Sequence, residues 1–307
     1  MDTKIKVVGV GGSGTNAISR MMKCNIKGVE LIALNADIQD LQPNKADRII
    51  QIGKKLTKGL GTGMDPEIGR EAAEEQKEEI KQALKGADMI FIACGLGGGC
   101  GSGASPVVAQ IAKSLGALTI AVVTRPFSFE GIQRAEIAEN SEKKLKSKVD
   151  TLIAISNDKL LDVAEEKITV SEAFWLCDEI LRQAVQGISD LIILPGIINI
   201  DFADIKAIMK NSGSALFGVG KASGFGRAEI AAKMALNSPL LDISCKGAKG
   251  ILFNVSGNGD VSLSEVDEVA KIITQEVSSS AKIIFGAIQN EKLKKGEIKV
   301  TVIATGF

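Results

Sequence analysis

Short apolar runs alternate with helical segments through the first half of the chain. The runs are rich in valine and isoleucine, as strands are, and the segments between them carry apolar residues at helical spacing. A strand, a helix and a second strand in succession favour parallel pairing. The first half therefore predicts a parallel sheet covered by helices on both faces, with strands at IKVVGV, VELIALNA, DMIFIACG, LTIAVVT and TLIAISN.

Two glycine-rich stretches follow the first and third of these runs. GVGGSG occupies residues 9–14, and GLGGGCGSG at residues 95–103 has six glycines among nine residues. Glycine is costly to order, so it is kept where the backbone needs a positive φ or must approach a ligand closely. Two such loops, each leaving a strand, indicate one polyanionic ligand.

The second glycine-rich stretch leads into an apolar helical pattern. Ser105 is typical of a helix N-cap, Pro106 suits the first helical position, and Val107, Val108 and Ile111 begin an apolar face. The pattern predicts a helix that starts at Pro106. Its free N–H groups and its dipole would favour a phosphate at the end of the glycine-rich stretch.

The second half has a different organisation. A long helical segment runs from Thr169 to about Leu191, and Glu172 is placed to form a capping box with Thr169. Helical stretches follow at DFADIKAIMK and SLSEVDEVAKIITQEV, with strand-like GILFNVSG, KIIFGAI and IKVTVIATGF. We predict an α/β protein with three parts: a Rossmann-like parallel-sheet domain over 1–168, a central helix and its connection over 169–195, and a smaller α+β domain over 196–307.

Composition excludes several kinds of chemistry. The chain has no histidine, so histidine triads, histidine metal sites and histidine proton relays are excluded, and acid–base work would fall to aspartate or glutamate. The 37 lysines and arginines equal the 37 aspartates and glutamates, so no net field directs the protein to nucleic acid or to an anionic membrane. A bound anion must therefore be held by local geometry.

Cysteine usage and hydropathy indicate the compartment. The five cysteines, Cys245 among them, are widely spread and never form a CxxC pair, which argues against a disulfide framework and a zinc site and fits a reducing compartment. The chain opens with no signal segment, and no apolar run approaches the ~20 residues of a membrane helix. We expect a cytoplasmic protein without direct membrane insertion.

The glycine-rich stretches leave more than one ligand open. GVGGSG satisfies the GxGxxG pattern of dinucleotide-binding proteins, and Asp37 after the second strand-like run could serve an NAD ribose. An NAD site does not require a second, richer glycine loop. A Walker A loop is excluded, because no GK pair is followed by serine or threonine. An NAD-dependent oxidoreductase stays as an alternative to a different nucleotide site.

GGGCGSG resembles the signature of the tubulin and FtsZ GTPases, GGGTGTG or GGGTGSG, with Cys100 in place of a threonine. The resemblance is closer to FtsZ, the bacterial cell-division GTPases, than to tubulin. It implies hydrolysis of GTP to GDP and phosphate, with residues 1–168 as the GTP-binding domain and residues 196–307 as the domain for polymerisation and GTPase activation. It extends over nearly the whole chain, through IKVVGVGGSGTNAI, LGTGMDPEIGREAA, TRPFSFEG, LRQAVQGISDLI, GIINIDFADI and TVIATGF.

The resemblance also assigns the nucleotide site. Asp178 matches the residue that recognises guanine, because a carboxylate accepts from the N1–H and the amine of that base. Glu130 and Arg134 match positions at the ribose and phosphate edge, although an exposed ion pair is the competing interpretation. Gly61 and Thr62 match a loop that senses the terminal phosphate. Backbone N–H groups would hold the phosphates at Gly11, Gly12, Ser13, Gly14, Thr15 and Asn16 and at Gly97, Gly98, Gly99, Cys100, Gly101 and Ser102.

Catalysis is assigned by resemblance to GIINIDFADI, in which Asn199, Asp201 and Asp204 match the NxDxxD segment of the family. There the carboxylates orient and polarise the water that attacks the γ-phosphate, although Asp201 also suits a helix N-cap. If Asp178 contacts the base, a helix rising ~1.5 Å per residue carries the chain ~20 Å further before this segment. The segment would then serve a neighbouring molecule's nucleotide, which makes a head-to-tail filament, with Mg²⁺ beside the phosphates.

Two departures from the family pattern matter. Cys100 is a weaker hydrogen-bond donor than threonine, and the helix N-terminus beside it is expected to favour its thiolate. The chain stops at Phe307, before the peptide by which FtsZ proteins bind membrane tethers, so tethering partners would need another anchor unless the chain is trimmed. We expect location at a mid-cell division ring. A tubulin-like filament GTPase for plasmid segregation or cell shape, and a non-hydrolysing scaffold, stay as alternatives.

Overall fold

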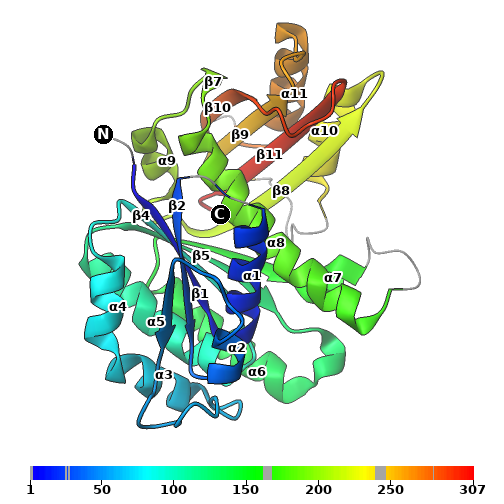
Figure 1. Cartoon of the computed structure of the whole chain (residues 1–307). Coiled ribbons are helices and arrows are strands. Elements are labelled where there is room, and N and C mark those ends of the chain that lie inside the picture. The colour runs from blue at the N-terminus through cyan, green and yellow to red at the C-terminus, as the bar shows by residue number, and fades with distance from the viewer. Residues whose placement is uncertain (1–2, 25, 27, 162–167, 239–246, 279) are drawn as a thin grey trace. The chain divides into compact units, whose positions relative to one another are not determined.

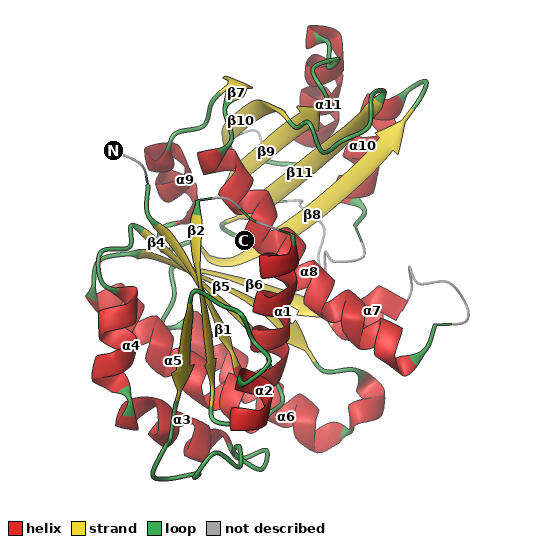
Figure 2. Ribbon diagram, viewed as in Figure 1, coloured by secondary structure: helices red, strands yellow, loops and turns green. Residues whose placement is uncertain are grey.

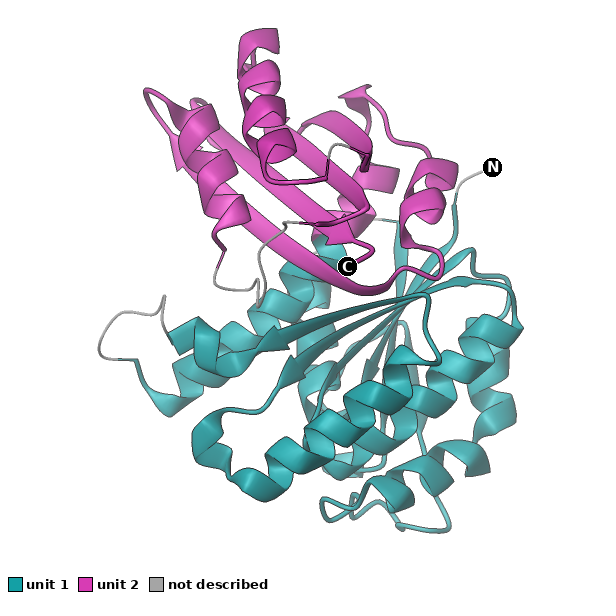
Figure 3. Ribbon diagram, turned by 180° about the vertical axis from the view of Figure 1, so that it is seen from behind, with its two compact units in different colours: residues 1–186 teal, residues 187–307 magenta. Residues whose placement is uncertain are grey.

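The computed structural model describes residues 3–24, 26, 28–161, 168–238, 247–278 and 280–307. The chain divides into two compact units, Met1–Gln186 and Gly187–Phe307 (Figure 3). Cys245 lies outside the described residues, and the four described cysteines are free thiols. Within the described part of the chain, no helix is both long and apolar enough to cross a bilayer.

The first unit is built on a parallel sheet in the order β3-β2-β1-β4-β5-β6, as predicted (Figure 1). All of the predicted apolar runs form strands, and the sequence analysis missed only the short β3. That strand lies at the edge of the sheet and is largely exposed, so its sequence lacks a buried run. The strands are β1 Ile5–Val10, β2 Val29–Asn35, β3 Arg48–Gln51, β4 Met89–Gly95, β5 Leu118–Arg125 and β6 Thr151–Ser156.

Helices cover both faces of this sheet, with α1 on one face and α3 to α6 on the other (Figure 2). Every residue of β1 is buried, as a strand covered on both faces requires. Val8 and Val10 of β1 pack in one core with Ala72 of α3 and Val108 of α5. The helices are α1 Gly11–Lys23, α2 Ile38–Leu41, α3 Pro66–Glu75, α4 Lys77–Leu84, α5 Gly99–Ser114, the 3-10 turn η1 Ser128–Glu130, α6 Ile132–Lys146 and α7 Asn157–Leu161.

The predicted start of α5 at Pro106 is wrong. The helix begins at Gly99, so part of the glycine-rich stretch forms its first turns, and Pro106 lies inside the helix. Ser105 does not cap: its Oγ donates to the Gly101 carbonyl oxygen at 2.6 Å. Local signals favoured a start at Pro106, but the glycines let the first turns of α5 pack directly against α3. This packing outweighs the backbone hydrogen bond that proline cannot donate.

Helix α8 spans Val170–Ile193, and its predicted capping box is confirmed. The Glu172 N–H donates to Thr169 Oγ1 at 3.2 Å, and the Thr169 N–H donates to Glu172 Oε2 at 2.7 Å. The division between the two units falls inside this helix, between Gln186 and Gly187.

The second unit is a mixed sheet in the order β8-β11-β9-β10-β7. β11 is antiparallel to β8 and β9, whereas β10 is parallel to β9 and antiparallel to β7. The predicted helical and strand-like stretches all form, but β7, β8 and α10 were missed. With three residues, β7 is too short to give a strand pattern, and the glycines and alanines of β8 and α10 give weak periodicity. The elements are β7 Gly196–Ile198, α9 Phe202–Met209, β8 Gly213–Ser223, α10 Arg227–Leu236, β9 Gly250–Gly257, α11 Leu263–Gln275, β10 Lys282–Gln289 and β11 Glu297–Thr305.

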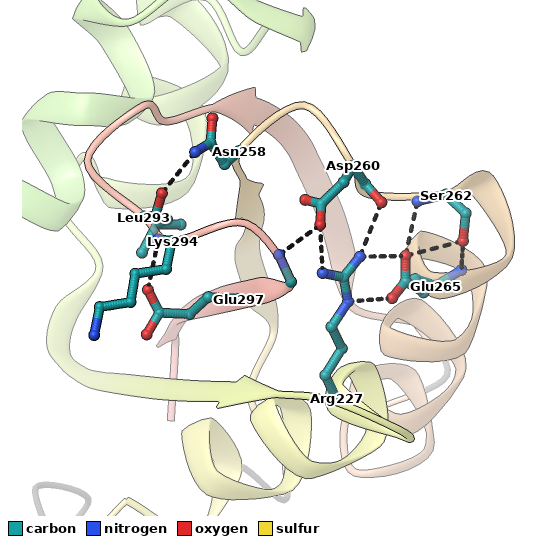
Figure 4. Close-up of polar contacts among 9 residues, drawn as sticks. Arg227, Asn258, Asp260, Ser262, Glu265, Leu293, Lys294 and Glu297 are labelled. Atoms are coloured by element: carbon teal, nitrogen blue, oxygen red, sulfur yellow. Dashed lines mark hydrogen bonds and ion pairs between the residues drawn. The ribbon is translucent and has the colours of Figure 1, made fainter.

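A buried arginine joins three segments of the second unit (Figure 4). Arg227, at the start of α10, is 9% exposed and bonds Glu265 Oε1 from Nε at 2.6 Å and Asp260 Oδ2 from Nη1 at 2.9 Å. The Gly296 N–H, in the loop before β11, also donates to Asp260 Oδ2, at 2.8 Å. Arg227 is the largest influence on Glu265 and lowers the pKa of that carboxyl to about 2. The guanidinium therefore holds the loops around α11 to α10.

We expect Arg227→Met to destabilise the second unit by about 2–4 kcal/mol, because both carboxylates lose their partner in a partly buried setting. Lys233→Met, which removes an exposed ion pair with Glu229 on the same helix, should cost no more than about 0.5 kcal/mol. Urea unfolding and native-state hydrogen exchange of β9 and α11 measure both. The pKa of Glu265 is depressed in the folded state. Its contribution to the free energy of unfolding is therefore complete above pH 4.5 and is lost as pH falls toward about 2. Equal effects of the two substitutions would contradict this role.

Candidate functional site

A cavity of about 570 Å³ lies at the carboxyl ends of the first unit's strands. This is the edge of a parallel α/β sheet at which ligands commonly bind. All of its lining residues belong to the first unit. Among them are these sequence-predicted residues: Gly11, Gly12, Ser13, Asn16, Gly61, Thr62, Gly98, Gly99, Cys100, Gly101, Glu130, Arg134 and Asp178.

Two helix N-termini border the cavity. Helix α1 begins at Gly11 and α5 at Gly99, directly after β1 and β4. The first N–H groups of each helix have no partner within the helix, and both dipoles favour negative charge. An added Cβ at Gly98 would meet no atom within 4 Å, so the backbone there borders open space. The arrangement can hold a polyphosphate without a lysine.

Four of the residues predicted to bind the nucleotide do not line the cavity. They are Gly14, Thr15, Gly97 and Ser102. An added Cβ at Gly14 would overlap the backbone of β4, so this glycine permits close packing of α1 on the sheet. Thr15 Oγ1 donates to the Gly12 carbonyl oxygen at 2.9 Å, and the Gly97 N–H donates to Ser102 Oγ at 2.9 Å. These contacts fix the shape of the two glycine-rich stretches.

Backbone contacts through glycine hold the first turns of α5 against residues 62–69. An added Cβ at Gly99 would lie 2.7 Å from the Asp65 carbonyl oxygen, and one at Gly103 would overlap the Pro66 carbonyl oxygen. From the other side, an added Cβ at Gly69 would overlap the Gly99 carbonyl oxygen. No side chain fits between these segments, so the loop that carries Thr62 is held directly against the glycine-rich turn.

Asp178, on α8, is the buried carboxylate of the cavity. It is 7% exposed, and burial raises its pKa to about 6, against the opposing effects of Arg20 and Ser13. Arg20 donates to Asp178 Oδ2 from Nε at 3.3 Å and from Nη2 at 3.2 Å. The carboxylate is thus ionised at neutral pH and faces the cavity in which a base could bind.

Glu130 and Arg134 form an ion pair among the residues that line the cavity. Arg134 Nη1 donates to Glu130 Oε2 at 2.9 Å, and Glu130 Oε1 accepts from the Phe127 N–H at 2.9 Å. The Glu130 side chain is 12% exposed and that of Arg134 39% exposed, so the pair is not fully solvated. Glu130 therefore fixes the turn before α6 and leaves the more exposed guanidinium at the cavity.

Cys100 does not have the thiolate character that its position at a helix start suggested. Burial raises its pKa to about 11, and the backbone N–H groups near it only partly oppose that effect. Desolvation favours the neutral thiol and outweighs the nearby backbone N–H groups, so the predicted thiolate is wrong. A second thiol, that of Cys177, also lines the cavity. Burial raises its pKa to about 12.

Several lining residues were missed by the sequence analysis. Asn35 ends β2, Thr124 lies near the end of β5, and Asn157 follows β6, so a search for polar residues at strand ends would have found them. Asn157 is 5% exposed, and its Oδ1 is buried with no partner within the described part of the chain. The other missed lining residues are Asp40, Met64, Gly95, Leu96, Pro126, Phe174 and Cys177, and Asp37 was expected only for an NAD ribose.

The acidic side chains at the cavity are already engaged. Asp37, considered above for an NAD ribose, accepts from the Gln39 N–H at 2.8 Å as the N-cap of α2. Asp40 Oδ2 accepts from Asn35 Nδ2 at 3.2 Å. No group of three or more acidic or cysteine side chains placed to hold a metal occurs among the residues described.

The three residues predicted to act in catalysis lie in the second unit and do not line the cavity. Asp201 caps α9, with its Oδ1 accepting from the Asp204 N–H at 2.8 Å. Asn199 Oδ1 accepts from the Gly196 N–H at 2.7 Å. Within the described ranges, the Asp204 carboxylate has no hydrogen-bond partner. The local geometry thus explains Asp201 as a cap, and it leaves the Asp204 carboxylate, in the first turn of α9, without a hydrogen-bond partner among the described residues.

Comparisons with known proteins identify the family of the chain. Residues 4–165 match the GTPase domain of the Tubulin/FtsZ family, and residues 213–307 match the C-terminal domain of the FtsZ family. An FtsZ dimer from M. jannaschii is 47% identical, with a TM-score of 0.95 over 100% of this chain and 89% of that chain. A GTPgS-bound protofilament of CetZ2 from Haloferax volcanii, 22% identical, has a TM-score of 0.83 over 98% of this chain and 92% of that chain and shows the fold alone.

We expect Gly98→Ala to leave stability unchanged and to weaken polyphosphate binding, because its methyl group would project into open space in the cavity. Gly103→Ala should instead destabilise the first unit by about 2–4 kcal/mol, because its methyl group would overlap the backbone of α3. Thermal unfolding and equilibrium nucleotide binding separate the two effects. Loss of stability in Gly98→Ala would show that this glycine is needed for folding.

We expect Cys100 to react slowly with iodoacetamide. A pKa of about 11 leaves about one thiol in a thousand ionised at pH 8, and the side chain is buried. Cys24, which is exposed, serves as the internal reference for peptide mass spectrometry of the modified protein. Modification of Cys100 as fast as Cys24 would contradict the burial effect.

Proposed function

The chain belongs to the Tubulin/FtsZ family and is a GTPase, and from that premise we propose that its active site is completed between subunits of a head-to-tail filament. The observation that carries the proposal is the engagement of every carboxylate at the cavity. Asp37 caps a helix, Asp40 accepts from Asn35, and Glu130 and Asp178 are paired with arginines. Each of these carboxylates already has a structural partner in its own subunit, so we assign the polarisation of the attacking water to acids of a neighbouring subunit.

We propose that GTP binds with its base at Asp178. A carboxylate is an acceptor only, and guanine presents the N1–H and the 2-amino group as adjacent donors. Phe174, which lines the cavity and is 42% exposed, adds an aromatic face beside Asp178. The ribose then lies toward Glu130 and Arg134, and the phosphates at the N-termini of α1 and α5. Gly61 and Thr62, on the loop packed against α5, face the terminal phosphate.

Hydrolysis is assigned to Asn199, Asp201 and Asp204 of the next subunit. Asp204 has no partner within the described residues, so its carboxylate is available to orient the attacking water and accept its proton. Asp201 holds the start of α9, and so fixes the backbone that carries Asp204. Two complementary surfaces on one molecule form a heterologous contact, which gives an open filament.

A magnesium ion fits this site as a companion of the nucleotide. Mg²⁺ keeps several waters and binds through one or two carboxylates together with substrate phosphates, so it needs no cluster of three protein ligands. Asp37 and Asp40 line the cavity and supply oxygen donors on its wall. When bound, the ion would neutralise developing charge on the phosphates.

We further propose that the filaments serve cell division. Self-association is expected because the solved relatives include an FtsZ dimer and a CetZ2 protofilament. A ring at mid-cell and membrane-tethering partners follow from membership of the family, and localisation of a fluorescent fusion tests them.

GTP turnover per subunit should rise with protein concentration, since each site needs a neighbour. Asp204→Ala should bind GTP normally, because its own cavity is intact, and should hydrolyse it at least about 100-fold more slowly.

Gly98→Asp should fail to bind GTP, because its carboxylate would enter the phosphate cradle. This position is better suited than Gly101, where an added Cβ would overlap the Gly95 carbonyl oxygen and threaten the fold.

Mixing Asp204→Ala with Gly98→Asp tests directly whether the active site is shared between subunits. The intact cavity of Asp204→Ala can meet the intact acids of Gly98→Asp at one type of junction, so partial turnover should return. Each variant alone at the same total concentration is the control. Wild-type turnover by Asp204→Ala alone would remove the main support for a shared site.

A further inference from the structure

One ion pair at the cavity joins two helices of the first unit. Arg20, on α1, donates to Asp178 on α8, and both of its contacts, at 3.3 and 3.2 Å, go to the same oxygen, Oδ2. The side chains are 24% and 10% exposed. The guanidinium also lies over the ring of Trp175, with its central carbon 5.0 Å from the ring centroid. Arg20 itself does not line the cavity.

We propose that Arg20 is a positioning residue for purine selectivity, which keeps Asp178 in its ionised, acceptor-only form and holds it by one oxygen while the other is left for the base. The inference rests on the proposed function of Asp178 in guanine recognition. Arg20 acts through the carboxylate and has no contact with the nucleotide.

The need for such a residue follows from the burial of Asp178. Burial is the largest effect on this carboxyl and raises its pKa from 3.8 to about 6, and Arg20 is the first of the groups that oppose it. Without the guanidinium the pKa would rise further, so the neutral acid would be populated near pH 7. A neutral acid carries a donor and an acceptor, and this pair matches the N1 and 6-amino groups of adenine. Loss of the charge therefore weakens the distinction between the two purines.

The other groups around Asp178 cannot replace Arg20. Ser13, on α1, has a smaller favourable effect on the ionised form. Cys177, next to it on α8, is a neutral thiol, with a pKa raised by burial to about 12. Glu130 carries a negative charge that also acts on Cys177, so it can only oppose ionisation nearby.

Glu179 does not take the arginine away from Asp178. It is bonded by Arg182 Nε at 2.8 Å and by Gln183 Nε2 at 2.9 Å, and Arg20 acts on it only weakly. Arg20 is thus the charged donor that faces Asp178 from α1, and Arg182 serves Glu179 on α8. The cation–π contact with Trp175 and the two donors, Nε and Nη2, hold the guanidinium at Asp178, and a lysine ammonium could not reproduce this fork.

The test compares GTP and ATP affinity from pH 5.5 to 8.5 in the wild type, Arg20→Gln, Arg20→Lys and Asp178→Ala. Competition against a fluorescent nucleotide is measured below the concentration at which turnover rises. The chain has no histidine, so few groups other than Asp178 and the terminal amine titrate in this range. In the wild type, selectivity for GTP should be lost below a midpoint near pH 6.

In Arg20→Gln the midpoint should move upward by about one to two pH units, with selectivity regained at high pH. The midpoint for Arg20→Lys should lie between those of Arg20→Gln and the wild type, since lysine restores the charge without the two-donor fork of arginine. The inference would be overturned if Arg20→Gln lost selectivity for GTP equally at every pH, or if the pH midpoint of its selectivity matched that of the wild type. An NMR titration of the Asp178 carboxyl in the empty protein measures the same shift without nucleotide.

Asp178→Ala separates this inference from the function on which it rests. If Asp178→Ala loses selectivity at every pH and Arg20→Gln behaves as the wild type, only the role of Arg20 fails. If Asp178→Ala keeps wild-type selectivity, Asp178 does not recognise the base and the proposed function of this residue fails first.

Discussion

The contact between the first turns of α5 and residues 62–69 is the constraint on which the site depends. Gly69, Gly99 and Gly103 bring two backbones so close that a single methyl group would overlap a carbonyl oxygen or a neighbouring side chain. Packing at this density tolerates no shift of one segment without the other. The loop with Thr62 and the helix N-terminus beside it therefore form one rigid cradle. Its geometry is set by the absence of side chains and not by their chemistry.

A cradle of this kind suits the charge of the chain. Equal numbers of acidic and basic residues give no general attraction for anions, so binding has to come from N–H groups that point to one place. The glycines supply those groups at two helix starts. The carboxylates at the cavity all have structural partners, and the chain has no histidine that could act as a base. Water activation is then expected from outside the subunit, which couples turnover to assembly.

Sequence reasoning succeeded where the signal was local and failed where packing decided. The strands β1, β2, β4, β5 and β6 were predicted because burial on both faces requires continuous apolar runs. The start of α5 was misplaced at Pro106, because a distant segment, α3, stabilises helix at Gly99. Asn35, Thr124 and Asn157 were missed, because single polar residues at strand ends carry no motif. The thiolate expected at Cys100 was wrong, because burial of a side chain cannot be inferred from its neighbours in sequence.

Recognition of guanine by a carboxylate sets two physical requirements against each other. The carboxylate must be shielded from water to distinguish one base from another, but burial favours its neutral form, which has the wrong donors and acceptors. A free lysine or a solvent-exposed arginine would be too well hydrated to offset that cost. Arg20 meets both requirements, because the face of Trp175 partly desolvates its guanidinium while its edge donates to Asp178. The packing of α1 beside α8 is thus as much a part of base recognition as the carboxylate itself.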